Sequence, residues 1–157
     1  MKVVDIALVS VGTPIRCGLY ENGLLIEERI SEELTLIALP RIFQPLLSDS
    51  SLRIRAIYYA NGPGSFSALK LTHIFLHTLS LLHDIELFAT SSFYFTDDKY
   101  IKAFGMTYFY MNENNDIALT SFMSPPPLAR FYMPKTLDTH RFHTRTEPLY
   151  ILPPVQG

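Results

Sequence analysis

Residues 53–83 constrain the fold most, because they join a strand pattern to a helix pattern through a short glycine loop. The strand pattern is RIRAIYYAN at 53–61, the loop is GPGSFS at 62–67, and the helix pattern covers about 66–83. A loop of this kind can bind phosphate, since free backbone N–H groups and the positive end of the helix point at one spot. It can also be only a tight turn, and composition by itself favours the turn.

Three short strands are predicted before this unit. Asn22-Gly23 separates the second from the third, and this dipeptide tolerates the positive φ angles of a tight hairpin, so these two strands are expected to be antiparallel neighbours. The N-terminal sequence MKVVDIALVSVG has strand-like Val and Ile content, which is typical of a core strand rather than a signal peptide. The three strands are expected at 3–11, 15–21 and 24–30.

A first helix is predicted over residues 31–47. Ser31 can cap it, and Glu32 and Glu33 in the first turn would favour the positive helix end. Pro40 lies well inside and is expected to kink the helix or divide it. With a further strand at 85–91, the order of elements predicts an α/β fold: the mixed sheet and right-handed parallel crossover of an actin-like, or ribonuclease-H-like, domain.

The pattern weakens beyond residue 98. Residues 103–112 and 117–123 predict a hairpin, which three prolines follow, and no long helix is expected after Leu128. We therefore expect two domains. An actin-like first domain with the glycine loop and two helices would span 1–98, and a reduced second domain with the hairpin and a C-terminal tail would span 99–157.

Composition narrows the functional classes. The 157 residues are 48% hydrophobic, enough for a sizeable core, and their net charge of −2 gives no general attraction to nucleic acid or anionic lipid. Cys17 is the single cysteine, so neither a disulfide nor a thiolate zinc cluster is expected, which fits a reducing compartment. The apolar stretch from Leu69 to Leu82 is too short and too polar to span a bilayer, and the cytoplasm is the expected location.

The glycine loop does not match the common phosphate-binding motifs. It lacks the Gly-Lys-Ser/Thr ending of a Walker A loop. Gly62 and Gly64 fit a Rossmann fingerprint, but Ser67 occupies its third glycine position and the preceding strands are wrong for that fold.

A more specific resemblance lies in residues 62–71, GPGSFSALKL, which are similar to the Gly-Pro-Gly-Ser-Phe-Thr-Gly-Leu-Arg-Ile signature of the TsaB family, formerly called YeaZ. Residues 147–151, EPLYI, resemble the closing Pro-x-Tyr-Leu-Arg segment of that family, and Glu33, Thr35 and Pro40 match its first helix. The likeness covers about residues 6–95 and then thins until the terminal segment. Family members are longer, so the chain resembles a version with a shortened second domain.

The resemblance implies an actin-like fold of the ASKHA type and a non-catalytic role. TsaB proteins are the dimerisation subunit of the bacterial machinery that places threonylcarbamoyl on adenosine 37 of tRNAs reading ANN codons. They bind the catalytic subunit TsaD through two helices, while TsaE is an ATPase. We accordingly expect TsaD and TsaE as partners, only indirect contact with tRNA, and no catalytic residue, metal or cofactor of the chain's own. ATP or ADP at the interface of the complex and a homodimer through the same helices are left open.

Two departures from the family pattern bear on mechanism. The family usually has Asp-Thr at the end of the first strand, where Val9 and Ser10 stand here. Valine cannot hold magnesium through water or orient a nucleophile, so ATP hydrolysis by the chain alone is not expected. Two signature glycines are replaced by Ala68 and Thr72, whose side chains argue against nucleotide binding in the loop.

The two helices are the expected partner interface. On the second helix, spacings of three and four give a polar stripe that includes His73 and His77, and an apolar stripe, with further apolar residues outside it. Phe43 and Phe75 are candidate anchors. The predicted interface residues are Leu36, Leu39, Phe43, Leu47, Ala68, Leu71, His73, Phe75, His77 and Leu79. In the loop, a nucleotide or partner contact is possible at Gly62, Pro63, Gly64, Ser65 and Phe66, with Ser65 also expected to cap the second helix.

Other functions remain as alternatives. The chain could be an actin-like nucleotide phosphatase or kinase, or a metal-dependent peptidase, acting on its own. His73 and His77 have the spacing of two metal ligands on one helix face, although no third ligand is evident and a polar interface stripe is favoured. Basic residues interleaved with Phe131 and Phe142 could touch tRNA phosphate, although a solvated loop is favoured.

Overall fold

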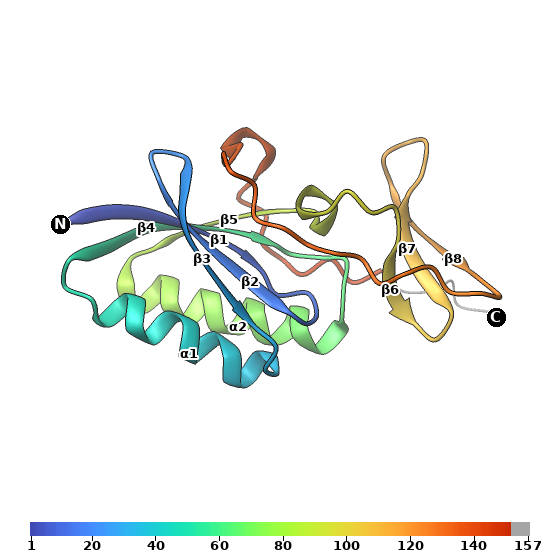
Figure 1. Ribbon diagram of the computed structural model, residues 1–157, viewed down its shortest axis with the longest axis horizontal. Helices are drawn as coiled ribbons and strands as arrows, with labels where there is room; N and C mark the ends of the chain where they lie inside the picture. The colour runs from blue at the N-terminus through green and yellow to red at the C-terminus, as the bar shows by residue number, and fades with distance from the viewer. Residues whose placement is uncertain (152–157) are drawn as a thin grey trace.

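The computed structural model of the chain describes residues 1–151 and contains a five-stranded mixed sheet with strand order β3-β2-β1-β4-β5 (Figure 1). The N-terminal meander is antiparallel, whereas β4 lies parallel to both β1 and β5. This is the predicted arrangement, a meander on one side and parallel crossovers on the other. The strands are β1 (Lys2–Val9), β2 (Ile15–Glu21), β3 (Leu24–Ser31), β4 (Leu52–Ala60) and β5 (Glu86–Thr90).

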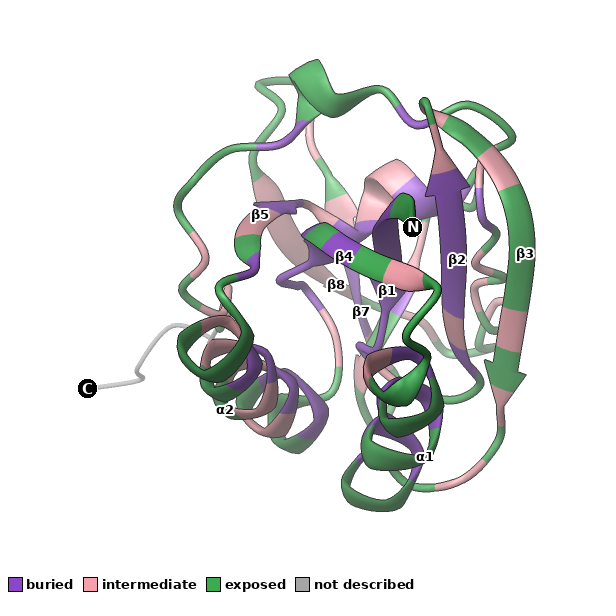
Figure 2. Ribbon diagram, turned by 90° about the vertical axis from the view of Figure 1, so that its left-hand side faces the viewer, coloured by how far each residue is buried: buried purple, intermediate pink, exposed green. Residues whose placement is uncertain are grey.

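Two helices, α1 (Thr35–Ser48) and α2 (Phe66–His83), cover one face of this sheet, each with its buried side toward the strands (Figure 2). The main core lies between them and the sheet. Ile6, Leu8, Phe43 and Leu76 are fully buried there, and the ring centroids of Phe43 and Phe75 lie 5.7 Å apart where the helices meet. The two helices run in the same direction. Their C-terminal ends are neighbours, since residues from both ends line one shared hollow.

The other face of the sheet is covered by a returning segment, residues 128–143, which runs back along the sheet from the second half of the chain (Figure 1). Its backbone is hydrogen-bonded to the first half at four places: the Tyr132 N–H donates to the Phe95 carbonyl, the Leu25 N–H to the Lys135 carbonyl and the Leu137 N–H to the Gly23 carbonyl, while His143 and Ala89 donate to each other's carbonyls. Met133, Leu137 and Phe142 belong to a second apolar cluster on this face. The predicted tail therefore packs against the first sheet.

A second, three-stranded antiparallel sheet lies at the far end of the molecule, with strands β6 (Ile101–Phe104), β7 (Thr107–Met111) and β8 (Ile117–Ser121). Two short 3-10 helices, η1 (Ser92–Phe95) and η2 (Thr139–Arg141), lie outside the sheets. The prediction of a single strand over 103–112 was wrong, because the chain turns at Gly105, whose φ is 54°. The division into domains at residue 98 stays a prediction, and residues 152–157 of the predicted tail lie outside the described residues.

The predicted start of the first helix was wrong, and of the two outcomes expected at Pro40, a kink or a division, the division was wrong. The helix begins at Thr35 rather than Ser31, because Ser31 is still paired with Ile15 in the sheet, and Leu34 at the N-cap offers no side-chain cap. Pro40 does not divide the helix, which continues through both Pro40 and Pro45. Both prolines lie on the exposed side. On the exposed side, water can replace the backbone hydrogen bond that each proline removes. Burial of the opposite side holds the helix together.

Several local predictions are confirmed. The second helix spans the predicted residues, and Ser65 caps it by accepting a bond from the Ala68 N–H. Asn22 and Gly23 turn the hairpin between β2 and β3 with φ angles of 52° and 80°. Within residues 1–151, we find no helix with the length and apolar character needed to cross a bilayer.

Candidate binding site at the helices and the glycine loop

The glycine loop is packed closely against other parts of the same chain. A Cβ atom at Gly62 would lie 2.8 Å from the Leu149 carbonyl oxygen, and the φ of Gly62 is 127°. A Cβ atom at Gly64 would lie 2.6 Å from the carbonyl oxygen of Val11. Such distances exclude a side chain, so the fold itself requires glycine at both positions.

The segment that approaches Gly62 is a strap, residues 144–150, which lies between α2 and the end of the sheet. The Leu149 N–H donates to the Asn61 carbonyl at 2.7 Å, and the Asn61 side-chain amide donates to the Glu147 carbonyl at 2.8 Å. The Tyr150 ring packs on Phe66 with 4.4 Å between centroids. At Pro63, the carbonyl accepts a bond from the Ser92 hydroxyl at 2.7 Å, which ties the other side of the loop to η1. The loop is thus enclosed from two sides.

The end of β1 is apolar where actin-like ATPases keep a carboxylate. Val9 is buried in the second apolar cluster. The hydroxyl of Thr72, on α2, lies 3.0 Å from the Ser10 hydroxyl and donates to the Ser10 carbonyl at 3.2 Å. Thr72 therefore fastens α2 to the end of β1. A hollow of about 240 Å³ lies beside the segment that follows β1, and Lys102 is the one charged residue in its lining.

The strap also accounts for the two helix histidines. His73 Nδ1 lies 3.2 Å from the Thr146 carbonyl oxygen, and His77 Nε2 lies 3.0 Å from the Thr146 hydroxyl. Because a carbonyl can only accept, His73 Nδ1 carries a proton. Burial, and then the proximity of His73, lower the pKa of His77, while Glu147 acts in the opposite direction. Among residues 1–151, no three His, Cys, Asp or Glu side chains are grouped to hold a metal, so nothing adds a third ligand to this pair.

The outer surface of the helices is apolar. Leu36 and Ile37 on α1 are 70% and 46% exposed, and Ile74 on α2 is 53% exposed. Leu81 and Leu82 are still more exposed. Large exposed apolar patches on soluble domains are typical of interaction sites. We call this surface the helix face; it consists of Leu36, Ile37, Leu47, Leu71, Ile74, Phe75, Leu81 and Leu82, of which Leu47, Leu71 and Phe75 are partly buried.

The structure separates the predicted interface residues into three groups. Leu36, Leu47, Leu71 and Phe75 belong to the helix face, whereas the two histidines lie under the strap. The remaining four are buried inside the chain, where a partner does not reach them in this conformation: Leu39, Phe43, Ala68 and Leu79. Ile74, Leu81 and Leu82 were not among the predicted contacts. Ile74 and Leu81 fall outside the regular apolar stripe of α2, together with the buried Leu69 and Leu76, whereas Leu82 belongs to the stripe, so periodicity alone did not identify the exposed residues.

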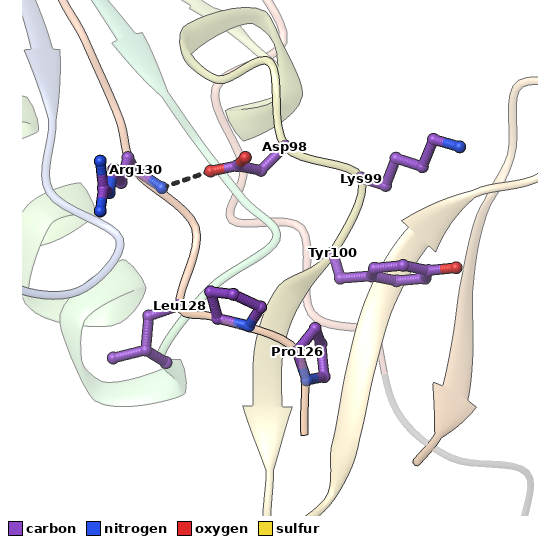
Figure 3. Close-up of a pocket in the computed structure, with 7 residues that line it drawn as sticks. Asp98, Lys99, Tyr100, Pro126, Leu128 and Arg130 are labelled. Carbon is purple, nitrogen blue, oxygen red and sulfur yellow. Dashed lines mark hydrogen bonds between the residues drawn. The ribbon is translucent and has the colours of Figure 1, made fainter. Parts of the chain in front are cut away.

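A separate hollow of about 330 Å³ lies between the second sheet and the proline-rich segment (Figure 3). Asp98 accepts a bond from the Arg130 backbone N–H at 2.7 Å, which uses one carboxylate oxygen for structure. The charged ends of Lys99 and Arg130 point away from each other (Figure 3). The hollow therefore does not gather charge around a ligand position.

No model of a known protein family matches the sequence, and no curated protein matches it either. Solved structures do match. YeaZ from Pseudomonas aeruginosa superposes with a TM-score of 0.62 at 14% identity, over 77% of this chain and 68% of that chain. The chain has the fold of YeaZ. An uncharacterised protein described as similar to the peptidase YeaZ, also from Pseudomonas aeruginosa, superposes with a TM-score of 0.60 at 14% identity, over 77% and 67% of the two chains.

The predicted fold class is thereby confirmed. The mixed five-stranded sheet with two helices on one face is the actin-like arrangement found in YeaZ, and the smaller second sheet fits a shortened second half. At 14% identity the likeness establishes the fold, and the function has to be argued from the surface and the loop.

Proposed function

We propose that the chain is a shortened member of the TsaB (YeaZ) family and acts as the non-catalytic subunit that binds TsaD. In that role it would support threonylcarbamoylation of adenosine 37 in tRNAs reading ANN codons, in the cytoplasm. The proposal rests on the helix face. In a chain with the YeaZ fold, the two helices that the family uses to bind TsaD lie side by side and expose large apolar side chains.

The composition of the helix face supports a protein partner. Exposed apolar side chains run along both helices, and polar residues border them, among them Arg41 and Gln44 on α1 and Lys70 on α2. An apolar centre with a polar border is the usual anatomy of a protein interface. Two helices that pack onto this surface would bury Ile74 and Leu81 and gain about 25 cal/mol for each Å² of apolar area removed from water.

The surroundings of the N-terminal end of α2 disfavour an activity of the chain's own. Val9 supplies no carboxylate, and the Ser10 hydroxyl is already engaged by Thr72. Val11 and Leu149 fill the space that glycines leave open in a phosphate-binding loop. These features disfavour the alternative of a nucleotide phosphatase, kinase or peptidase. ATP or ADP bound between subunits, TsaE as a further partner and indirect contact with tRNA stay predictions that depend on the complex.

A pair of matched substitutions tests the proposal. Ile74 and Ile26 are exposed to similar extents, 53% and 47%, but Ile74 lies on the helix face and Ile26 on the edge strand β3. Each is changed to Glu, and the variants are mixed with TsaD from the same organism and measured by light scattering after size exclusion. We expect the wild type and I26E to form a complex that supports tRNA modification. We expect I74E to weaken binding at least about 100-fold, since a buried unpaired carboxylate costs several kcal/mol.

Two outcomes would contradict the proposal. If the wild type forms no complex with TsaD and modification proceeds equally well without it, the role is wrong although the fold is shared. If I74E and I26E bind equally well, the partner does not use the helix face. Magnesium-dependent ATP turnover by the isolated wild type, abolished by a loop substitution such as Ser65→Ala, would instead favour the enzymatic alternative.

A further inference from the structure

Helix α1 contains two prolines, and both lie on its exposed side. Proline has no backbone N–H, so the carbonyl four residues earlier loses its usual helical donor. The two carbonyls affected are those of Leu36, opposite Pro40, and of Arg41, opposite Pro45. Among the side-chain hydrogen bonds of residues 1–151, none ends on either of these oxygens. In the free chain, water can occupy both positions.

The two carbonyls lie on different flanks of the helix. Residues spaced three or four positions apart lie on the same side of a helix. One such line along α1 consists of Leu36, Pro40, Phe43 and Leu47. Phe43 on this line contacts Phe75 of α2, and Leu47 lines the hollow at the joined C-terminal ends of the helices. The Leu36 carbonyl therefore belongs to the flank toward α2, inside the helix face. Pro45 is rotated from Pro40 by roughly 140° around the axis, which places the Arg41 carbonyl on the opposite flank.

Covering the helix face changes the energetics of one carbonyl and not of the other. A partner that packs against Leu36 and Ile74 removes the water at the Leu36 carbonyl. A buried backbone acceptor without a donor loses its hydrogen bonds to water and gains none in return, which weakens binding. An entirely apolar partner helix would incur this cost, whereas a helix with a suitably placed polar side chain would not.

We propose that the partner seated on the helix face presents a side-chain hydrogen-bond donor, from Arg, Lys, Asn or Gln on a helix, to the Leu36 carbonyl that Pro40 leaves without its helical donor. The inference rests on the proposed function, because it assumes that a partner helix covers this surface. It adds a specificity element: Pro40 leaves the Leu36 carbonyl available as a hydrogen-bond acceptor in the helix face, in addition to the apolar contacts. Pro45 has the same local chemistry outside the contact.

The chain offers its own matched control. Pro40→Ala and Pro45→Ala each restore an N–H group for the carbonyl four residues earlier and each replace a poor helix former by the best one. We expect both variants to unfold at a higher temperature than the wild type. We expect the affinity for TsaD, measured by calorimetry, to fall about 3- to 10-fold for P40A, because the restored intrahelical bond competes with the partner's donor. P45A is expected to bind as the wild type does.

A double-mutant cycle separates a lost hydrogen bond from a change in helix shape. The exposed Arg, Lys, Asn and Gln residues on TsaD helices are changed to Ala one at a time. One of them should weaken binding to the wild type and leave binding to P40A unchanged. The inference is overturned if P40A binds as tightly as P45A, or if no partner residue couples to Pro40, while the complex itself still forms. A failure of the wild type to bind TsaD at all would overturn the proposed function and this inference with it.

Discussion

The two flanks of α2 are covered in different ways. On one flank the strap lies along the helix, and Thr146 engages both His73 and His77. On the other flank Ile74 and Leu81 are exposed, with no described part of the chain over them. Polarity therefore does not decide which flank of α2 meets solvent. The polar flank is closed by the chain itself through hydrogen bonds, and the apolar flank stays exposed.

The largest expected effect is at the loop that the strap closes. Gly62→Ala forces a side chain into a position with φ of 127° and against the Leu149 carbonyl, so we expect a loss of about 3 kcal/mol or more in the free energy of unfolding. Gly105 also has a positive φ, 54°, but a Cβ atom there would have no neighbour within 4 Å. Gly105→Ala should therefore cost only about 1 kcal/mol. Equal losses in urea denaturation would mean that the strap does not press on the loop.

An intermediate effect is expected where the strap is bonded to the sheet. The Tyr59 hydroxyl donates to the Thr146 carbonyl at 3.0 Å, and burial raises the pKa of Tyr59 to about 12. Tyr59→Phe removes the donor, and we expect a loss of about 1 kcal/mol together with faster amide exchange in the strap. Tyr110→Phe, at a partly exposed tyrosine of the second sheet, serves as the control and should be neutral. Unchanged exchange in Y59F would argue that the strap is held by its backbone bonds alone.

The smallest expected effect is a dependence on pH. The pKa of His77 lies below its ordinary value of 6.5, so the folded chain disfavours the charged imidazole. This contribution to stability is present above about pH 6.5 and is lost as the pH falls below that value toward the lowered pKa. Since the ring is partly exposed, we expect less than about 1 kcal/mol. Subtracting the stability curve of His77→Gln from that of the wild type isolates the effect, and identical slopes between pH 7 and 5 would contradict it.

Local signals predicted much of the fold. The Asn22-Gly23 hairpin, the Ser65 cap and the extent of α2 follow from nearby residues, and the structure confirms them. Ser31 failed as a cap because sheet pairing with Ile15, which local sequence does not reveal, holds it in β3. The strap has no periodic pattern, so its contact with the histidines was invisible. The polar stripe of α2 was therefore assigned to a partner, although Thr146 of the strap contacts both of its histidines.

The backbone hydrogen bond between Leu149 and Asn61 joins two residues that are far apart in the sequence, so the ribosome adds Leu149 long after Asn61. The first sheet and its two helices can form while the second half of the chain is still being made, because domains generally fold from the N-terminus during translation. The surroundings of Gly62 cannot be completed until Leu149 has left the ribosome. We expect the nascent chain to expose the polar flank of α2 and the glycine loop until Leu149 has left the ribosome, so that the loop is completed after the sheet and the helices around it have formed.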